Sequence, residues 1–306
     1  RRVQLFTGKG GVGKTSLVLG LALEAARRGH RPLIVELGHR ASVPELLGQG
    51  AGPAVGYTPV ELVPGVFAMN MSLDDALEDY ITAQVRVRRV ARAITQSQSL
   101  RRFFHAAPAV NEVVTLARLS RLAEPAPGAR GSFSPILVDL DATGHALMFL
   151  ELPRVFEGLA SSGPLRALLD GFSRLLRDER TTVLHLVTLP LELPAHETRD
   201  LFMQLRGDGT SPARVPLGAL VLNGVPREPL TEADVAQLPQ LAERVPDVRG
   251  DIALARRVLR GVGEARSAEA WLRERVPLPT KRLPRVTGVL GQAELAQLGA
   301  TLLGDA

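Results

Sequence analysis

The chain has 306 residues, with 37 Lys and Arg against 32 Asp and Glu, a formal net charge of +5, and no cysteine. The lack of cysteine excludes disulfides, thiol redox chemistry and thiolate metal sites, and it favours a reducing compartment. The basic residues are scattered arginines with few aromatics near them, so we expect no nucleic-acid surface. No apolar stretch approaches the length of a membrane span and no signal peptide precedes the first apolar run. We therefore expect a cytoplasmic protein without stable membrane insertion.

A glycine-rich loop follows the apolar run 3–7 and precedes an amphipathic helix over 14–28. Its spacing, G-x-x-x-x-G-K-T, is that of a phosphate-binding loop in the required strand–loop–helix context. Glycines let backbone N–H groups approach phosphates, Lys14 can reach the β- and γ-phosphates, and the Thr15 hydroxyl can ligate Mg²⁺. The loop predicts a site for ATP or ADP with Mg²⁺, formed by Gly8, Lys9, Gly10, Gly11, Val12, Gly13, Lys14, Thr15 and Ser16.

The next elements predict a parallel sheet interrupted by helices. A second apolar run, 32–36, completes a β-α-β unit and ends in Glu36, at the edge where open α/β sheets bind ligands. Residues 48–64 are rich in glycine and proline and predict a loop. Apolar residues at helical spacing from 72 to 124 predict consecutive helices, so we assign 65–130 as a helical insertion. It could serve as a lid, a dimer surface or a binding groove.

The sheet resumes at 135–139, an apolar run that ends in Asp139. In a nucleotide-binding domain this is the place of the carboxylate that serves as the Mg²⁺-water ligand, whereas the alternative is a surface carboxylate at a strand end. Asp141 and His145 follow. Either could orient the attacking water or report the γ-phosphate, but an Asp that caps the next helix and a His that bonds the backbone are equally open. A short second piece of the insertion is predicted at 153–180.

The remaining elements alternate between strands and helices. We predict a helix at 165–177, a strand at 182–187, a helix through 205 and a strand at 217–222. Asn223 then could pair with an adenine edge, or could be a turn residue. Helices over 231–274, a proline-punctuated loop at 277–288 and a helix at 292–303 complete the chain. The fold class is α/β, a parallel-sheet P-loop NTPase core flanked by helices, with 1–306 as a single domain.

With Lys9 as its second residue, the loop takes the deviant form x-K-G-G-x-G-K-T, and the run 139–153 contains Ala-Thr-Gly-His and Leu-Glu-Leu-Pro. These motifs resemble those of the arsenite-pump and tail-anchored-protein-targeting ATPases, and the resemblance extends in order over almost the whole chain. It implies ATP hydrolysis by a homodimer, or by a heterodimer with a related ATPase, in which Lys9 crosses the interface to the partner's nucleotide. It also implies that Asn223, and the backbone around Pro277 to Pro284, contact adenine.

The sequence departs from this family after the second strand. The usual Asp-Pro-Ala, whose Asp polarises the attacking water, is replaced by Glu-Leu-Gly-His-Arg at 36–40, so Glu36 or Asp141 would have to substitute. The cysteine pair of zinc-binding members is absent. We expect a dimeric ATP-driven switch that controls an unidentified protein partner or client. The alternatives are a catalytically weak regulatory subunit paired with an active relative, and a targeting chaperone for hydrophobic clients.

Overall fold

The computed structural model describes residues 1–37, 41–48, 54–71, 73–84, 110–124, 132–140, 146–151, 163–207, 215–228 and 230–304. The strands are β1 Val3–Thr7, β2 Leu33–Glu36, β3 Val60–Val63, β4 Val66–Asn70, β5 Ile136–Asp139, β6 Thr182–Thr188, β7 Leu217–Val225 and β8 Thr280–Pro284. They form one sheet in the order β3-β4-β2-β5-β1-β6-β7-β8, in which every pair is parallel except β3 with β4. The fold is therefore α/β with a mostly parallel sheet, as predicted.

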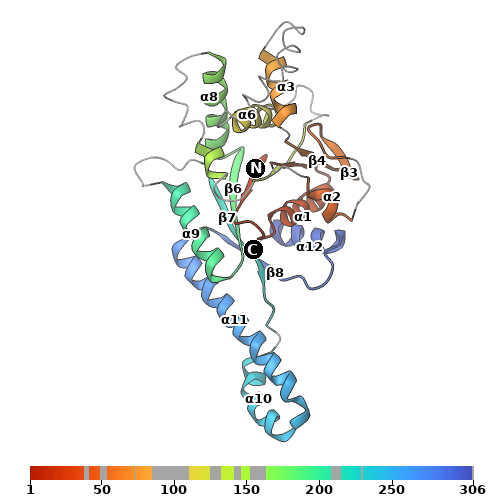
Figure 1. Ribbon diagram of the computed structural model, residues 1–306, viewed down its shortest axis with the longest axis vertical. Coiled ribbons are helices and arrows are strands. Elements are labelled where there is room, and N and C mark those ends of the chain that lie inside the picture. The colour runs from red at the N-terminus through yellow and green to blue at the C-terminus, as the bar shows by residue number, and fades with distance from the viewer. Residues whose placement is uncertain are drawn as a thin grey trace.

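Helices cover both faces of this sheet (Figure 1). They are α1 Lys14–Arg27, α2 Val43–Leu46, α3 Leu73–Gln84, α6 Val110–Ala123, α8 Pro164–Arg177, α9 Glu192–Arg206, α10 Glu232–Arg244, α11 Arg249–Arg275 and α12 Gln292–Leu303. None of these helices, within the part of the chain described above, is long and apolar enough to cross a bilayer.

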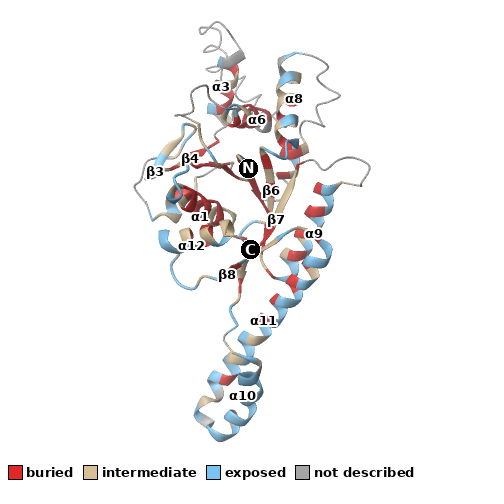
Figure 2. Cartoon of the chain, turned by 180° about the vertical axis from the view of Figure 1, so that it is seen from behind, coloured by how far each residue is buried: buried red, intermediate tan, exposed pale blue. Residues whose placement is uncertain are grey.

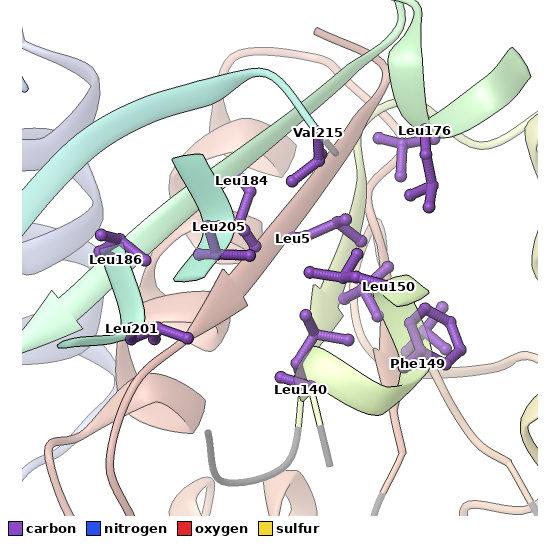
Figure 3. Close-up of a cluster of buried hydrophobic side chains, with 14 of the residues drawn as sticks. Leu5, Leu140, Phe149, Leu150, Leu176, Leu184, Leu186, Leu201, Leu205 and Val215 are labelled. Atoms are coloured by element: carbon purple, nitrogen blue, oxygen red, sulfur yellow. The ribbon is translucent and has the colours of Figure 1, made fainter. Parts of the chain in front are cut away.

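Successive side chains along each strand point to opposite faces of the sheet, so the core consists of two apolar layers, one on each face. In β1, Val3 and Leu5 face the layer that contains α6, α8, α9 and α11, whereas Phe6 faces the layer that contains α1 and α12. The buried residues follow the strands and the helix faces turned toward them (Figure 2). On the first face, Leu5 and Leu184 of the sheet lie near Leu205 of α9 and Leu150 of the helical residues 146–151 (Figure 3). The central strands are thus buried on both sides.

Three stretches differ from the sequence-based prediction. The predicted loop 48–64 contains β3, and the first residues of the predicted insertion 65–130 form β4 of the sheet. The predicted loop 277–288 contains β8, which pairs in parallel with β7. Helices α3, α6 and α8 lie where helices were predicted, whereas 85–109 and 125–130 of the insertion lie outside the described residues.

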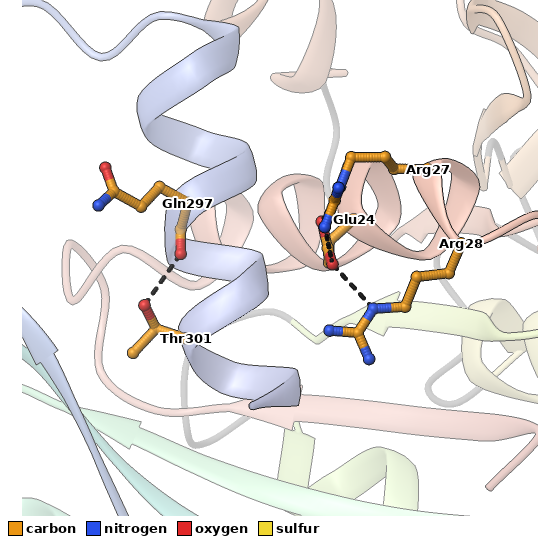
Figure 4. Close-up of polar contacts among 5 residues, drawn as sticks. All are labelled: Glu24, Arg27, Arg28, Gln297 and Thr301. Carbon is orange, nitrogen blue, oxygen red and sulfur yellow. Dashed lines mark hydrogen bonds and ion pairs between the residues drawn. The ribbon is translucent and has the colours of Figure 1, made fainter. Parts of the chain in front are cut away.

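The helix after the glycine-rich loop packs closely on the last helix. A Cβ atom on Gly299 of α12 would lie 2.0 Å from the carbonyl oxygen of Gly20 in α1, so the two backbones touch. At the end of α1, the buried carboxylate of Glu24 accepts hydrogen bonds from Arg27 and Arg28, beside α12 (Figure 4). These bonds lower the pKa of Glu24 to about 2 and keep it ionised. Close helix packing therefore fixes the position of α1.

We expect Gly299→Ala to lower the free energy of unfolding by about 1–3 kcal/mol, because α12 must move away from α1 to admit the methyl group. The control is Gly263→Ala in α11, where a Cβ atom meets nothing within 4 Å. That change should instead stabilise the chain by about 0.5–1 kcal/mol through helix propensity. Urea unfolding measures both. A stabilising effect of Gly299→Ala would contradict the close packing.

Candidate functional site

The glycine-rich loop, residues 8–13, joins the carboxyl end of β1 to α1 in the middle of the sheet. A Cβ atom on Gly8 would lie 2.0 Å from the carbonyl oxygen of Val187 in β6. One on Gly13 would lie 2.4 Å from Nδ2 of Asn223 in β7, and Gly13 also has a φ angle of +89°. Neighbouring strands thus require glycine at both ends of the loop.

This loop and the start of α1 have the features of an anion-binding site. Gly13 is the N-cap of α1 and offers no side chain to accept the first-turn N–H groups, which carry the positive end of the helix dipole. The ammonium of Lys14 lies over the same loop and donates to the carbonyl oxygens of Gly8, at 3.1 Å, and Lys9, at 3.2 Å. Backbone donors and one full positive charge therefore converge where a phosphate would bind.

A hydroxyl and a carboxylate meet beside this anion site. Thr15 Oγ1 in the first turn of α1 donates to Asp139 Oδ2 at the end of β5, at 2.5 Å. No group of three or more His, Cys, Asp or Glu side chains suited to a metal occurs among the residues that the structure describes. Mg²⁺ rarely needs such a group, because it keeps several waters and shares phosphate oxygens with one or two protein ligands. Thr15 and Asp139 fit that role.

Glu36 lies at the same edge, since β2 pairs with β5 and places Glu36 level with Asp139. Its side chain is buried, and its carboxylate accepts the backbone N–H of Ser42 at 2.7 Å and of Val43 at 3.5 Å. Burial raises the pKa of Glu36, the N–H donors oppose that rise, and the charge of Asp139 adds to it. The carboxylate thus anchors the segment between β2 and α2.

Lys9 has a partner that the sequence did not indicate. Its ammonium forms an ion pair with Glu197 on α9, and the side chains are 40% and 35% exposed. Because β6 lies next to β1, α9 begins beside the glycine-rich loop. The only local signal was an acid in the second turn of the helix after β6, but a contact across 188 residues depends on the fold.

The structure brings Asn223 to the loop but not Pro277. The side-chain amide of Asn223 donates to the carbonyl oxygen of Val12 at 2.8 Å, and Asn223 itself belongs to β7 instead of following it. Pro277 precedes the amino end of β8, on the order of 20 Å along the chain from Pro284. Because β8 runs parallel to β7, Pro277 lies at the opposite edge of the sheet, and its predicted adenine contact is wrong on geometry.

Asp141 and His145 lie in 141–145, and Gly38 to Arg40 in 38–40, outside the described residues. The predicted catalytic use of Asp141 therefore stays a prediction. The catalytic use of Glu36 also stays a prediction, although its position at the carboxyl edge of the sheet is as expected.

A strand, a glycine-rich loop and a helix with Lys14 and Thr15, facing a strand-end carboxylate, define a P-loop nucleotide-binding protein. The family model for the anion-transporting ATPases matches residues 1–162, and the chain belongs to that family.

Three relatives illustrate the range of similarity. The ATPase BagA of Mycobacterium tuberculosis is 27% identical over 234 residues, which cover 72% of this chain and 64% of the relative. The ATPase GET3C of Arabidopsis thaliana is 23% identical, over 73% of this chain and 66% of the relative. The arsenical pump-driving ATPase of Acidiphilium multivorum is 29% identical, over 52% of this chain and 27% of the relative. The match thus spans 64% of the length of the mycobacterial relative.

The raised pKa of Glu36 predicts a pH-dependent difference between the wild type and Glu36→Gln. Unfolding returns the pKa of Glu36 toward its ordinary value of 4.5, so the folded chain holds this proton to higher pH than the unfolded chain. The stability contributed by Glu36 therefore falls as pH rises from 4.5 through the folded pKa. In urea unfolding between about pH 4 and pH 7, the free energy of unfolding of the Gln variant should rise relative to that of the wild type as the pH increases. A difference that does not vary with pH would contradict this assignment.

Proposed function

We propose that the chain binds ATP with Mg²⁺, hydrolyses it, and uses the nucleotide to close a dimer that controls a protein partner. The observation that carries the proposal is the convergence of Lys14, Thr15 and Asp139 at one end of the glycine-rich loop. Membership of an ATPase family supports nucleotide hydrolysis as the reaction. The names of the relatives, ATPase and arsenical pump-driving ATPase, describe those proteins and agree with this class.

Each of these side chains has a distinct task in the proposal. Lys14 and the first-turn N–H groups of α1 would neutralise and position the phosphates. Thr15 and Asp139 would hold Mg²⁺, which supplies positive charge where negative charge develops on the transferred phosphoryl group. Asn223 would support the loop from β7, because its amide bonds the Val12 carbonyl. Catalysis would then consist mainly of positioning and electrostatic stabilisation.

A second candidate is a nucleotide-binding regulatory subunit with weak hydrolysis, paired with an active relative. The geometry of Glu36 favours it, because the carboxylate is buried and engaged by two backbone N–H groups instead of lying open to water. Turnover by the purified chain alone separates the two candidates. Hydrolysis that survives Glu36→Gln unchanged would exclude both Glu36 as the base and the regulatory candidate.

Lys14→Ala should weaken ATP binding by about 10- to 100-fold, because a charge-assisted contact to the phosphates is lost. The chain offers a matched control in Lys281→Ala, which removes the same charge from a lysine that bonds the carbonyl of Gly304 near the end of α12. Isothermal titration with ATP and Mg²⁺ measures both variants. Equal affinity of Lys14→Ala and the wild type would contradict the assignment of the loop.

The ion pair of Lys9 with Glu197 holds within one chain the lysine that we propose acts on the partner's nucleotide. Glu197→Gln should therefore free Lys9 and lower, by up to about fivefold, the protein concentration needed for half-maximal turnover. Lys9→Ala should leave ATP affinity unchanged and suppress turnover at every concentration. Glu192→Gln, at the start of the same helix, is the control. If the wild type and Lys9→Ala show equal turnover per chain, Lys9 does not act on the partner's nucleotide.

A further inference from the structure

Strand β7 contains one extra residue opposite His185 of β6. The pairing of the two strands shifts by one residue at this point, so Gly218 and Ala219 of β7 both lie opposite His185. This is a β-bulge, in which the extra residue has no partner in the ladder. Leu184 and Leu186 point into the layer that contains α9 (Figure 3), so His185 between them faces α1 and α12. The function proposed above gives His185 and the bulge no task.

The faces reached by the side chains of β7 show what the bulge does. Leu217 and Leu220 both pack in the layer that contains α9 and α11, although residues three apart in a regular strand point to opposite faces. From Leu220 to Leu222 the alternation is regular, so Asn223 points to the other face, on the side of α1. There its amide donates to the carbonyl oxygen of Val12 at 2.8 Å.

Without the bulge, Asn223 would point away from the glycine-rich loop. The side-chain period of a strand is two residues, so a shift of one residue turns every following side chain to the opposite face. The Asn223 amide would then leave Val12 and enter the layer that contains α9 and α11. The contact between β7 and the loop therefore depends on the extra residue in β7.

His185 supplies the hydrogen-bond partner that the ladder lacks at the bulge. The backbone N–H of Ala219 donates to Nδ1 of His185 at 3.1 Å, so the ring is neutral and carries its proton on Nε2. Burial lowers the pKa of His185 to about 4, which preserves this acceptor near neutral pH. The ring stacks on Phe6 of β1, with the centroids 5.1 Å apart, and a Cβ atom on Gly218 would lie 2.7 Å from its Cε1. The imidazole is thus fixed between β1 and β7.

We propose that His185 is a positioning residue for the nucleotide site, because by accepting the Ala219 N–H it stabilises the bulge that directs Asn223 to the glycine-rich loop. The inference rests on the function proposed above, which assigns this loop to the nucleotide. His185 acts through β7 and contacts no phosphate. Removal of the acceptor leaves the Ala219 N–H unpaired inside the sheet, and this favours a β7 register without the bulge.

The first test follows the side-chain amide of Asn223 by NMR in the nucleotide-free chain. Selective ¹⁵N labelling of the three asparagines gives few signals, and Asn223→Ala identifies the one that belongs to Asn223. His185→Leu, which removes the acceptor, should shift this signal. His185→Phe, which keeps a ring against Phe6 but also lacks the acceptor, should shift it in the same way. An Asn223 signal that stays at the wild-type position in both variants would overturn the inference.

Two variants separate the hydrogen bond from packing at the bulge. His185→Asn should leave the Asn223 signal near its wild-type position, because the asparagine Oδ1 can accept the Ala219 N–H in place of Nδ1. Val183→Ala removes an apolar side chain that lies against Gly218 but keeps the imidazole, so it should also leave the signal unchanged. Circular dichroism checks that each variant folds. A shift in Val183→Ala equal to that in His185→Leu would assign the effect to packing and contradict the proposal.

The second test measures the affinity for ATP with Mg²⁺ by isothermal titration. His185→Leu and Asn223→Ala should each weaken binding about 3- to 10-fold, as expected for one hydrogen bond that supports the loop. The double variant should bind no more weakly than either single variant, because both changes remove the same contact. His185→Asn should bind within about twofold of the wild type. Losses that add in full would show that His185 does not act through Asn223.

The two tests distinguish failure of this inference from failure of the proposed function. A wild type that does not bind ATP would contradict the assignment of the glycine-rich loop, while the NMR signal of Asn223 would still decide whether His185 sets the register of β7. A wild type that binds ATP, with His185→Leu equal to it in affinity, would instead leave the proposed function intact and overturn the positioning role.

Discussion

The contact of the glycine-rich loop with its neighbouring strands is the constraint on which the rest of the site depends. Gly8 lies against the Val187 carbonyl and Gly13 against the Asn223 amide, so any side chain at either end would displace the loop from β6 or β7. Thr15 connects the following helix to Asp139 on the other side of β1. Because these strands are parallel neighbours, their register alone brings the glycine-rich loop and the Asp139 carboxylate together.

The same register creates an electrostatic conflict at Glu36. It places a second carboxylate level with Asp139 on the neighbouring strand, where burial and like charge both disfavour ionisation. The backbone N–H groups of Ser42 and Val43 offset part of that cost. Glu36 thus holds in place the segment that follows β2. A carboxylate committed to holding backbone is poorly placed to accept a proton from water.

The sequence predicts well what depends on local pattern. The loop, the β-α-β unit and the strand ending at Asp139 follow from glycine spacing and apolar runs, because central parallel strands are buried on both faces. It misses β3 and β8, each of which has a single buried residue, Leu62 and Leu283, and therefore lacks an apolar run. Missing β8 also misplaced Pro277, since a strand fixes which edge of the sheet its preceding residues reach. The pair Lys9–Glu197 joins distant segments, so no local pattern predicts it.

The composition of α10 makes its stability depend on packing. The helix begins with a capping box, in which Thr231 and Asp234 bond each other's backbone, but it contains Pro239, which removes a backbone hydrogen bond and costs about 3 kcal/mol in a helix interior. A helix of 13 residues is marginal in water even without proline, so packing of its apolar side must stabilise it. Within one chain, α11 covers Leu238 and Ala242 only in part and leaves Val235, Leu241 and Val245 exposed. The stability of α10 therefore depends on apolar contacts that α11 supplies only in part.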